Sequence, residues 1–244
     1  MSTTAASKRR RLGVRRRTLL FVSVCAALIG AVVLSAHYRE RRARAAEAEI
    51  EQAGGQVKTA WGAWIRPFGT VSAVLLHESK VRDDDLAHLK DLNFVVTVTL
   101  NKTAITDAGL KHLAELHDLV RLNLGDTQIG DAGLEHLGGL QMLQFLMLQN
   151  TKTGDEGLKH LVGLENLMAL DLSGTNVSNA GIVHLKELPH LRYLSLADTK
   201  VTDACLPELG ELKRLEQIAL THSRVTAAGA QKLKQLLPSC RIEY

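Results

Sequence analysis

A unit of 24 residues recurs seven times along this chain, from Val71 to about Pro238, and this period limits the possible folds more than any other feature. One leucine column comprises Leu76, Leu100, Leu124, Leu148, Leu172, Leu196 and Leu220, and a second comprises Leu89, Leu113, Leu137, Leu161, Leu185, Leu209 and Leu233. A polar column has the same step, with Ser79, Thr103, Thr127, Thr151, Thr175, Thr199 and Ser223. Because one such unit cannot bury its apolar face alone, the repeats are expected to stack into a solenoid with a continuous core.

Each copy divides into a strand, a turn and a helix. The alternation of apolar and polar residues in Leu122-Asn123-Leu124 predicts a short half-buried strand, and the strands of successive copies should form one parallel sheet. The repeated Thr of the next turn is expected to bond backbone groups of the adjacent coil and thereby form a ladder. A repeated Asp, such as Asp107, precedes the apolar run at the position of a helix N-cap, with Asn179 in its place in one copy and Ala227 in the last.

The pattern Leu-x-x-Leu-x-Leu-x-x-Thr-x-Ile-Thr-Asp-x-Gly-Leu-x-x-Leu resembles the leucine-rich repeat family, in the variant with Thr where many members carry Asn. This subtype is similar to the ribonuclease-inhibitor-like superfamily, and the layout of the chain resembles membrane-anchored bacterial leucine-rich repeat proteins. The resemblance implies an α/β fold, namely a curved solenoid of right-handed βα coils with one parallel sheet on its concave face. Residues 71–244 would form this domain, with seven repeats and a strand-like C-terminal tail from Arg241 to Tyr244.

The N-terminal segment predicts a membrane location. Residues 18–38 carry no charge, and a helix of about 20 residues spans the hydrocarbon core of a bilayer. Seven Lys and Arg residues precede this segment in the basic tail 1–17, whereas residues 39–44 carry a net charge of about three. We therefore expect a single-pass signal anchor with a cytoplasmic N-terminus and an extracytoplasmic repeat domain. A cleaved export signal is the alternative, but no clean Ala-x-Ala site ends the apolar run.

Residues 39–70 are predicted to form a juxtamembrane helix and an N-terminal cap. The stretch from Ala45 to Ala53 has the pattern of a helix, and Gly54-Gly55 is a pair suited to its C-terminus. Trp61, Trp64 and Phe68 are expected to cover the open end of the first repeat, with contact to a membrane surface as the alternative.

The distribution of charge argues against a nucleic-acid partner. Residues 1–44 hold 11 of the 30 Lys and Arg residues and 1 of the 26 Asp and Glu residues, so 19 basic and 25 acidic residues remain for the rest of the chain. A nucleic-acid-binding domain needs a basic face, whereas this domain is mildly acidic. The basic N-terminus instead suits anionic lipid headgroups beside residues 18–38.

Neither a catalytic site nor a cofactor site is predicted. One column does contain five histidines, His88, His112, His136, His160 and His184. Stacked coils place these side chains in a line, whereas a metal site needs ligands that converge on one point, so we interpret them as packing residues that bond the neighbouring coil. Cys205 and Cys240 are out of register with the repeat and are not expected to form a disulfide. The glycines follow the repeat period and form no phosphate-binding motif.

The outward-facing residues of the strands remain as a candidate binding surface. Arg121, Phe145, Met147 and Tyr193 fall in the two outward columns of the central repeats, and residues of these types are enriched at protein interfaces. We therefore predict a membrane-anchored protein that binds a protein or peptide partner through these residues of the concave face. The alternative is a structural spacer of the cell envelope without a discrete ligand, and an enzyme is the third possibility.

Overall fold

The computed structural model describes residues 38, 40–60, 70–92 and 94–244, and the chain divides into two compact units, residues 1–44 and 45–244. The predicted membrane helix lies outside the described residues except for Tyr38. Among the residues that are described, no helix is both long enough and apolar enough to cross a bilayer. In the described part of the first unit, the Arg42 guanidinium lies 5.5 Å from the centre of the Tyr38 ring, and Arg44 forms an ion pair with Glu40.

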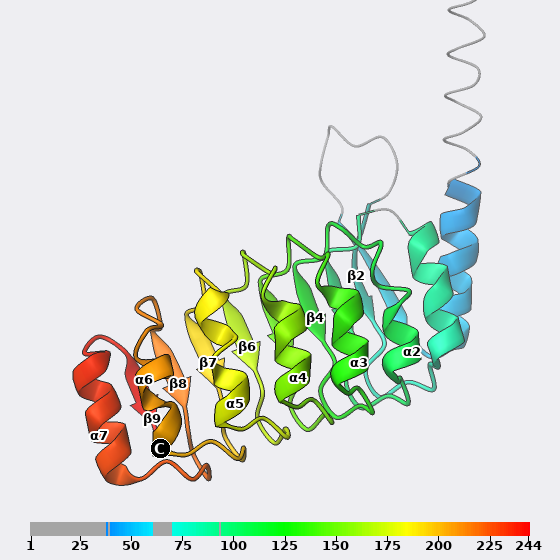
Figure 1. The fold of residues 1–244 in the computed structure, drawn as a ribbon. Coiled ribbons are helices and arrows are strands. Elements are labelled where there is room, and N and C mark those ends of the chain that lie inside the picture. Colours follow the sequence, from blue (N-terminus) through cyan, green and yellow to red (C-terminus); the bar gives the residue numbers. More distant parts are fainter. Residues whose placement is uncertain (1–37, 39, 61–69, 93) are drawn as a thin grey trace, which may run out of the picture. The chain divides into compact units, whose positions relative to one another are not determined.

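The second unit is built on one nine-stranded sheet whose strands follow each other in chain order (Figure 1). The strands are β1 Gln56–Ala60, β2 Thr70–Leu75, β3 Thr97–Thr99, β4 Arg121–Asn123, β5 Phe145–Met147, β6 Ala169–Asp171, β7 Tyr193–Ser195, β8 Gln217–Ala219 and β9 Arg241–Glu243. All pairings from β2 to β9 are parallel, as the repeat predicted, but β1 pairs antiparallel with β2. The predicted parallel sheet of the repeats is therefore confirmed, and β1, which belongs to the cap and not to a repeat, adds one antiparallel strand at this end.

The C-terminal tail continues the repeat. Ile242 of β9 pairs with Ile218 of β8, which is the same step of 24 residues that separates the other strands. The predicted strand-like tail is confirmed, and its register makes it an eighth parallel strand of the same sheet.

Short helices cover one face of the sheet (Figure 1). The α-helices are α2 Asp107–Leu110, α3 Asp131–Leu134, α4 Asp155–Leu158, α5 Asn179–Ile182, α6 Leu206–Leu209 and α7 Ala227–Leu236. The 3-10 helices are η1 Asp83–Asp91, η2 Glu135–Leu137, η3 Lys159–Leu161, η4 Leu185–Glu187 and η5 Asp203–Cys205. A 3-10 turn contains fewer residues than an α-helical turn. Each repeat therefore keeps enough of its 24 residues to lead the chain back to the next strand.

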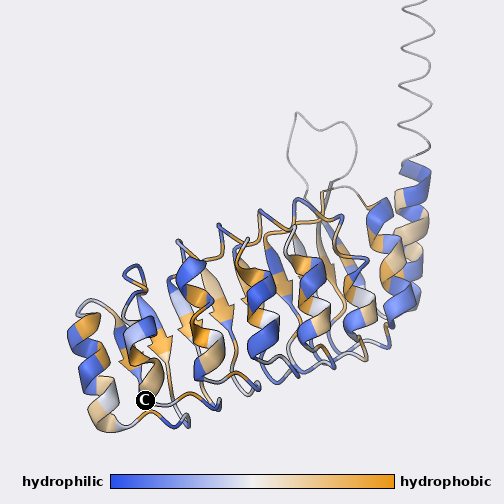
Figure 2. Cartoon of the chain, in the orientation of Figure 1, coloured by the Kyte–Doolittle hydropathy of each residue, from blue (hydrophilic) through white to orange (hydrophobic). Residues whose placement is uncertain are grey.

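The leucine columns form the core between the sheet and the helices. Leu124 and Leu148 of the first column, and Leu113 and Leu137 of the second, have no exposed surface. In Figure 2, the strands combine apolar and hydrophilic segments, and the helices carry hydrophilic segments on the surface that faces the viewer. Burial of each leucine side chain contributes roughly 1.5–3 kcal/mol, so stacking of the repeats supplies the stability that a single repeat lacks.

The N-terminal helix closes one end of this core. Residues 40–52 are helical, and Gly54 adopts a positive φ of 87° just beyond the helix, which confirms the predicted helix end. Ala46 and Ile50 are buried in the same cluster as Val74 and Leu76 of the first repeat. The helix from Ala45 onward therefore caps the first coil; the part of the predicted cap that contains Trp61, Trp64 and Phe68 lies outside the described residues.

The threonine column does not form the expected ladder between coils. Thr127 Oγ1 donates to the carbonyl of Leu124 in its own coil at 2.6 Å, and Thr103 does the same with Leu100. These hydroxyls are buried, and the bond back along the chain satisfies them locally. Each threonine therefore closes the turn after its own strand.

The acidic column instead joins the coils. Asp107 begins α2, and its Oδ1 accepts the N–H of Gly130 on the next coil at 2.7 Å. The same contact recurs along the array, between Asp83 and Thr106, Asp131 and Gly154, Asp155 and Ser178, Asn179 and Thr202, and Asp203 and Thr226. The prediction that each Asp caps its own helix was wrong, because the side chain holds the residue that precedes the next helix.

Candidate functional site

The candidate site lies on the sheet face, defined here as the side of β2–β9 opposite the helices and predicted to be concave. In the three-residue strands β3 to β8 the central side chain is buried and its two neighbours point outward, as in β4, where Leu122 is buried between Arg121 and Asn123. One outward column comprises Ala73, Thr97, Arg121, Phe145, Ala169, Tyr193, Gln217 and Arg241, and the other comprises Leu75, Thr99, Asn123, Met147, Asp171, Ser195, Ala219 and Glu243. The sequence predicted these columns as far as Gln217 and Ala219, and β9 adds Arg241 and Glu243.

Arg121 and Phe145 form a pair on neighbouring strands. The Arg121 guanidinium lies 4.7 Å from the centre of the Phe145 ring, within the range of a cation–π interaction. Since β4 and β5 pair in register at these two residues, the contact follows from the strand alignment. The pair presents a flat surface with a positive charge and an aromatic ring.

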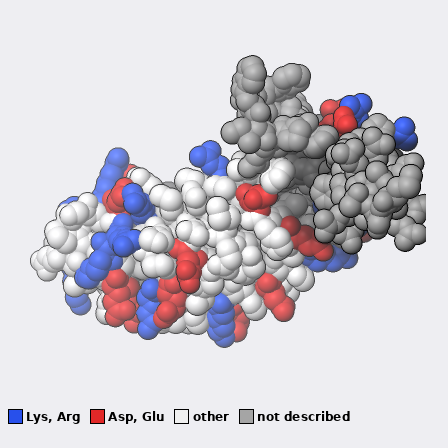
Figure 3. All heavy atoms as spheres, turned by 90° about the horizontal axis from the view of Figure 1, so that it is seen from above, with Lys and Arg blue, Asp and Glu red and all other residues white. Residues whose placement is uncertain are grey.

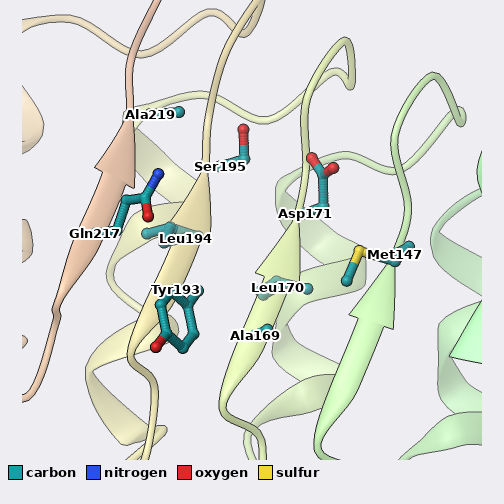
Figure 4. Close-up of a pocket in the computed structure, with 9 residues that line it drawn as sticks. All are labelled: Met147, Ala169, Leu170, Asp171, Tyr193, Leu194, Ser195, Gln217 and Ala219. Carbon is teal, nitrogen blue, oxygen red and sulfur yellow. The ribbon is translucent and has the colours of Figure 1, made fainter. Parts of the chain in front are cut away.

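A hollow lies beside this pair. Ala169 separates Phe145 from Tyr193 in the same column, and its small side chain leaves space between β5 and β7. The hollow has a volume of about 340 Å³. Its lining residues are Met147, Ala169, Leu170, Asp171, Tyr193, Leu194, Ser195, Gln217 and Ala219 (Figure 4).

One end of the hollow is polar. The half-buried Asp171 accepts two hydrogen bonds at Oδ1, from the N–H of Ser173 at 2.9 Å and from its hydroxyl at 2.5 Å. The Ser173 hydroxyl also lies 2.6 Å from the hydroxyl of Ser195, which lines the hollow. Asp171 Oδ2 accepts no hydrogen bond from any described residue. The carboxylate thus has one oxygen bound and one oxygen available.

Tyr193 forms the opposite end of the hollow. Its side chain is 42% exposed, and its hydroxyl donates to Glu216 Oε2 at 3.0 Å. Glu216 also pairs with Arg192 at 3.1 Å. The hydrogen bond to Glu216, together with the negative charge of that carboxylate, raises the pKa of Tyr193. The hydroxyl therefore stays protonated at neutral pH, and the bond to Glu216 restrains the ring at the edge of the hollow.

The four residues predicted as a partner-binding patch fall into two adjacent groups. Arg121 and Phe145 contact each other, whereas Met147 and Tyr193 line the hollow. The sequence reasoning did not select Asp171, Ser195 or Gln217 of the lining. All three belong to the same outward columns, and Asp171 is an acidic residue in a column with otherwise uncharged neighbours on β5 and β7.

The histidine column and the cysteines show no arrangement for chemistry. Among the described residues, three or more His, Cys, Asp or Glu side chains do not gather as metal ligands would. The five histidine rings are half-buried and form no hydrogen bond with a described residue, so the expected bonds to the next coil do not form. Burial lowers the pKa of His112, and nearby Lys111 adds to this effect. Burial also raises the pKa of the Cys205 thiol to about 11, so this free cysteine is a poor nucleophile.

Comparisons with known proteins agree with this architecture. A family model for the leucine-rich repeat matches residues 115–138, which is one repeat unit. A search of curated proteins finds no match. The strands, turns and helices described above repeat the matched unit along the array, so the second unit has the fold of a leucine-rich repeat solenoid and is similar to the leucine-rich repeat family.

Solved structures of the same fold come from Listeria monocytogenes. An internalin, InlF, has a TM-score of 0.57 and 22% identity over 70% of this chain and 46% of its own length. Internalin C2 has a TM-score of 0.56 and 24% identity over 70% of each chain. This chain therefore spans less than half the length of InlF, and identities this low establish a shared fold only.

Proposed function

We propose that this chain is a membrane-anchored leucine-rich repeat protein that binds a protein partner through its sheet face. The observation that supports this most directly is the group formed by the Arg121–Phe145 pair and the adjacent hollow with Met147 and Tyr193. No described helix covers this side of the sheet, and of its outward side chains only Ala169 is buried (Figure 1). Aromatic, Met and Arg side chains at the centre of an interface supply most of its binding energy.

The charge of the repeat domain supports a protein partner over a nucleic acid. Acidic residues outnumber basic ones beyond residue 44, at 25 against 19. Figure 3 shows Lys and Arg side chains beside Asp and Glu side chains along the array. A nucleic-acid interface would need a continuous basic surface.

The anchor is the second part of the proposal. Its support is the uncharged segment 18–38 and the greater positive charge of residues 1–17. With the N-terminus in the cytoplasm, the repeat domain lies outside the cytoplasmic membrane. The arginines that flank the segment contact lipid headgroups in this arrangement.

Site-specific photocrosslinking in native membranes tests the binding face. A photoreactive amino acid at Tyr193 is expected to give a discrete adduct with one partner. The matched control is Val183, which is exposed at the end of α5 on the helix side. Equal adducts from both positions, or an adduct from Val183 only, would contradict the proposal.

A further inference from the structure

The carboxylate of Asp171 is the most specific chemical feature of the hollow. Figure 4 shows it at one end, with Ser195 on the neighbouring strand and the Met147 side chain extending from β5 toward it. Ser173 binds Oδ1 and thereby holds the carboxylate in place. The free Oδ2 is a fixed acceptor at the edge of a space large enough for a side chain.

The cations near this face do not neutralise Asp171. None of the nine described residues that line the hollow is Lys or Arg. Arg121 lies over the Phe145 ring, and Arg241 forms an ion pair with Glu243 at 3.0 Å. The hollow therefore has one negative charge and no positive charge of its own.

The walls of the hollow suit a long side chain. Met147, Ala169 and Ala219 provide apolar surface, and the Tyr193 ring stands at the other end. Lysine and arginine bury apolar stems while their charged heads reach a polar group. Their cationic heads also interact with aromatic rings and form strong hydrogen bonds with carboxylates.

We propose that the hollow between β5 and β8 binds an arginine or lysine side chain of the protein partner, with Asp171 Oδ2 as the acceptor for its charge. This inference rests on the proposed function, because it assigns a chemistry to the partner of the same face. The apolar stem packs against Met147 and Ala169, and the partner backbone crosses the strands above Tyr193.

The test begins with selection from a display library of random short peptides on the immobilised full chain in detergent. The retained pool is expected to be enriched in Arg and Lys. One retained peptide is then synthesised with its basic residue and with a neutral counterpart, citrulline for Arg or norleucine for Lys. Binding of both peptides is measured by fluorescence polarisation against the wild type, Asp171→Asn, Asp171→Lys and the control Asp118→Asn.

Loss of the charge from the peptide should weaken binding to the wild type and to Asp118→Asn about tenfold, as for other charge-assisted hydrogen bonds. The same change should have little effect on binding to Asp171→Asn, because the acceptor charge is already absent. Asp118 is an appropriate control because it is exposed and lies outside the outward columns of the strands. Asp171→Lys should reject the basic peptide and, in a repeated selection, retain acidic peptides.

Three outcomes are decisive. The inference is supported if removal of the peptide charge weakens binding to the wild type but has little effect on binding to Asp171→Asn. The inference is overturned if the retained peptides contain no basic residues. The proposed binding face still stands in that case if these peptides no longer bind the Phe145→Ala Tyr193→Ala double variant. The absence of any retained peptide overturns both the inference and the proposed binding function.

Discussion

The carboxylate of Asp107 occupies the space that a side chain at Gly133 would need. A Cβ atom on Gly133 would lie 2.5 Å from Asp107 Oδ1 and 3.2 Å from the Asp107 Cα atom. The two residues are on successive coils. Asp107 Oδ1 also accepts the N–H of Gly130, the residue directly before α3, and α3 contains Gly133. The repeated Asp and the repeated Gly therefore form one contact between coils.

The exceptions in these columns agree with this explanation. Cys205 replaces the glycine, and the residue opposite it is Asn179, whose amide binds both the N–H and the hydroxyl of Thr202. In the first copy the glycine position is Asp85, whose carboxylate accepts the N–H of Arg82 within its own turn. The glycine position thus carries a larger side chain only in the copies where no Asp of the preceding coil makes the usual contact with it.

Substitution of Gly133 by Ala is expected to destabilise the protein. The added methyl group must displace the Asp107 carboxylate and also meets the Asp107 backbone, so the cost should be about 1–3 kcal/mol, as for other overpacked sites. Gly139→Ala is the matched control, because nothing lies within 4 Å of its added Cβ atom. Denaturant unfolding of the full chain in detergent measures both, and equal stabilities would contradict the assigned contact.

Asp203→Asn is expected to make the protein less sensitive to acid. The Thr226 hydroxyl and N–H donate to Asp203 and lower the pKa of this carboxyl from its ordinary value of 3.8. The stabilising contribution of a carboxyl with a lowered pKa is complete above the unfolded-state pKa and is lost as the pH falls through the folded-state pKa. Below pH 3.8, the variant should therefore lose less stability than the wild type.

An amide at this position should preserve the contact at neutral pH, because Asn179 already makes the equivalent contact with Thr202. Thermal melts over a pH series compare the wild type, Asp203→Asn and Asp118→Asn. The Asp118 variant should follow the wild type, since no hydrogen bond from a described residue holds its exposed carboxylate. If the melting temperature of Asp203→Asn changes with pH in the same way as that of the wild type, the Asp203 carboxyl does not contribute to the acid sensitivity.

The period of the sequence was sufficient to predict the strands, their register and the buried columns. A step of 24 residues fixes which side chains are neighbours, so the sequence alone predicts that Phe145, Ala169 and Tyr193 lie on three adjacent strands. The same step would also have placed Ile242 beside Ile218. The position of a residue within the repeat thus determines its side of the sheet.

The period was not sufficient to predict the partners of the polar side chains. Thr127 and Asp107 both have donors or acceptors within reach in their own coil and in the next, and the sequence does not indicate which bond forms. The hollow also depends on details beyond the pattern. Its shape follows from the small side chain of Ala169 and from the hydrogen bond that restrains Tyr193.

Leu148→Ala should be far more destabilising than Phe145→Ala. Leu148 is fully buried at the centre of the array, so its truncation leaves a cavity and should cost ~2–5 kcal/mol. Phe145 points to the sheet face, is only half-buried and contacts Arg121, so its loss should cost less than about 1 kcal/mol. Chemical denaturation compares the two variants. A similar loss of stability in both would show that Phe145 contributes to the core.

Protease added to intact spheroplasts is expected to digest the repeat domain. This follows from the proposed anchor at residues 18–38, whose more basic flank is N-terminal and remains in the cytoplasm. A cytoplasmic marker protein checks that the cells stay closed. Survival of the repeat domain until the membrane is lysed would contradict the proposed orientation.

Replacement of both Phe145 and Tyr193 by Ala should abolish partner capture while the melting temperature changes little. These rings flank Ala169 on the sheet face, and central interface residues of this type can each contribute more than ~2 kcal/mol. The contrasting variant reverses the charges of Lys111 and Glu135, which are exposed on the helix side of the array, and should leave capture unchanged. The readout for both variants is capture of the partner that the photocrosslinking experiment identifies. If the aromatic variant still captures the partner and the charge-reversed variant does not, the helix side and not the sheet face carries the interaction.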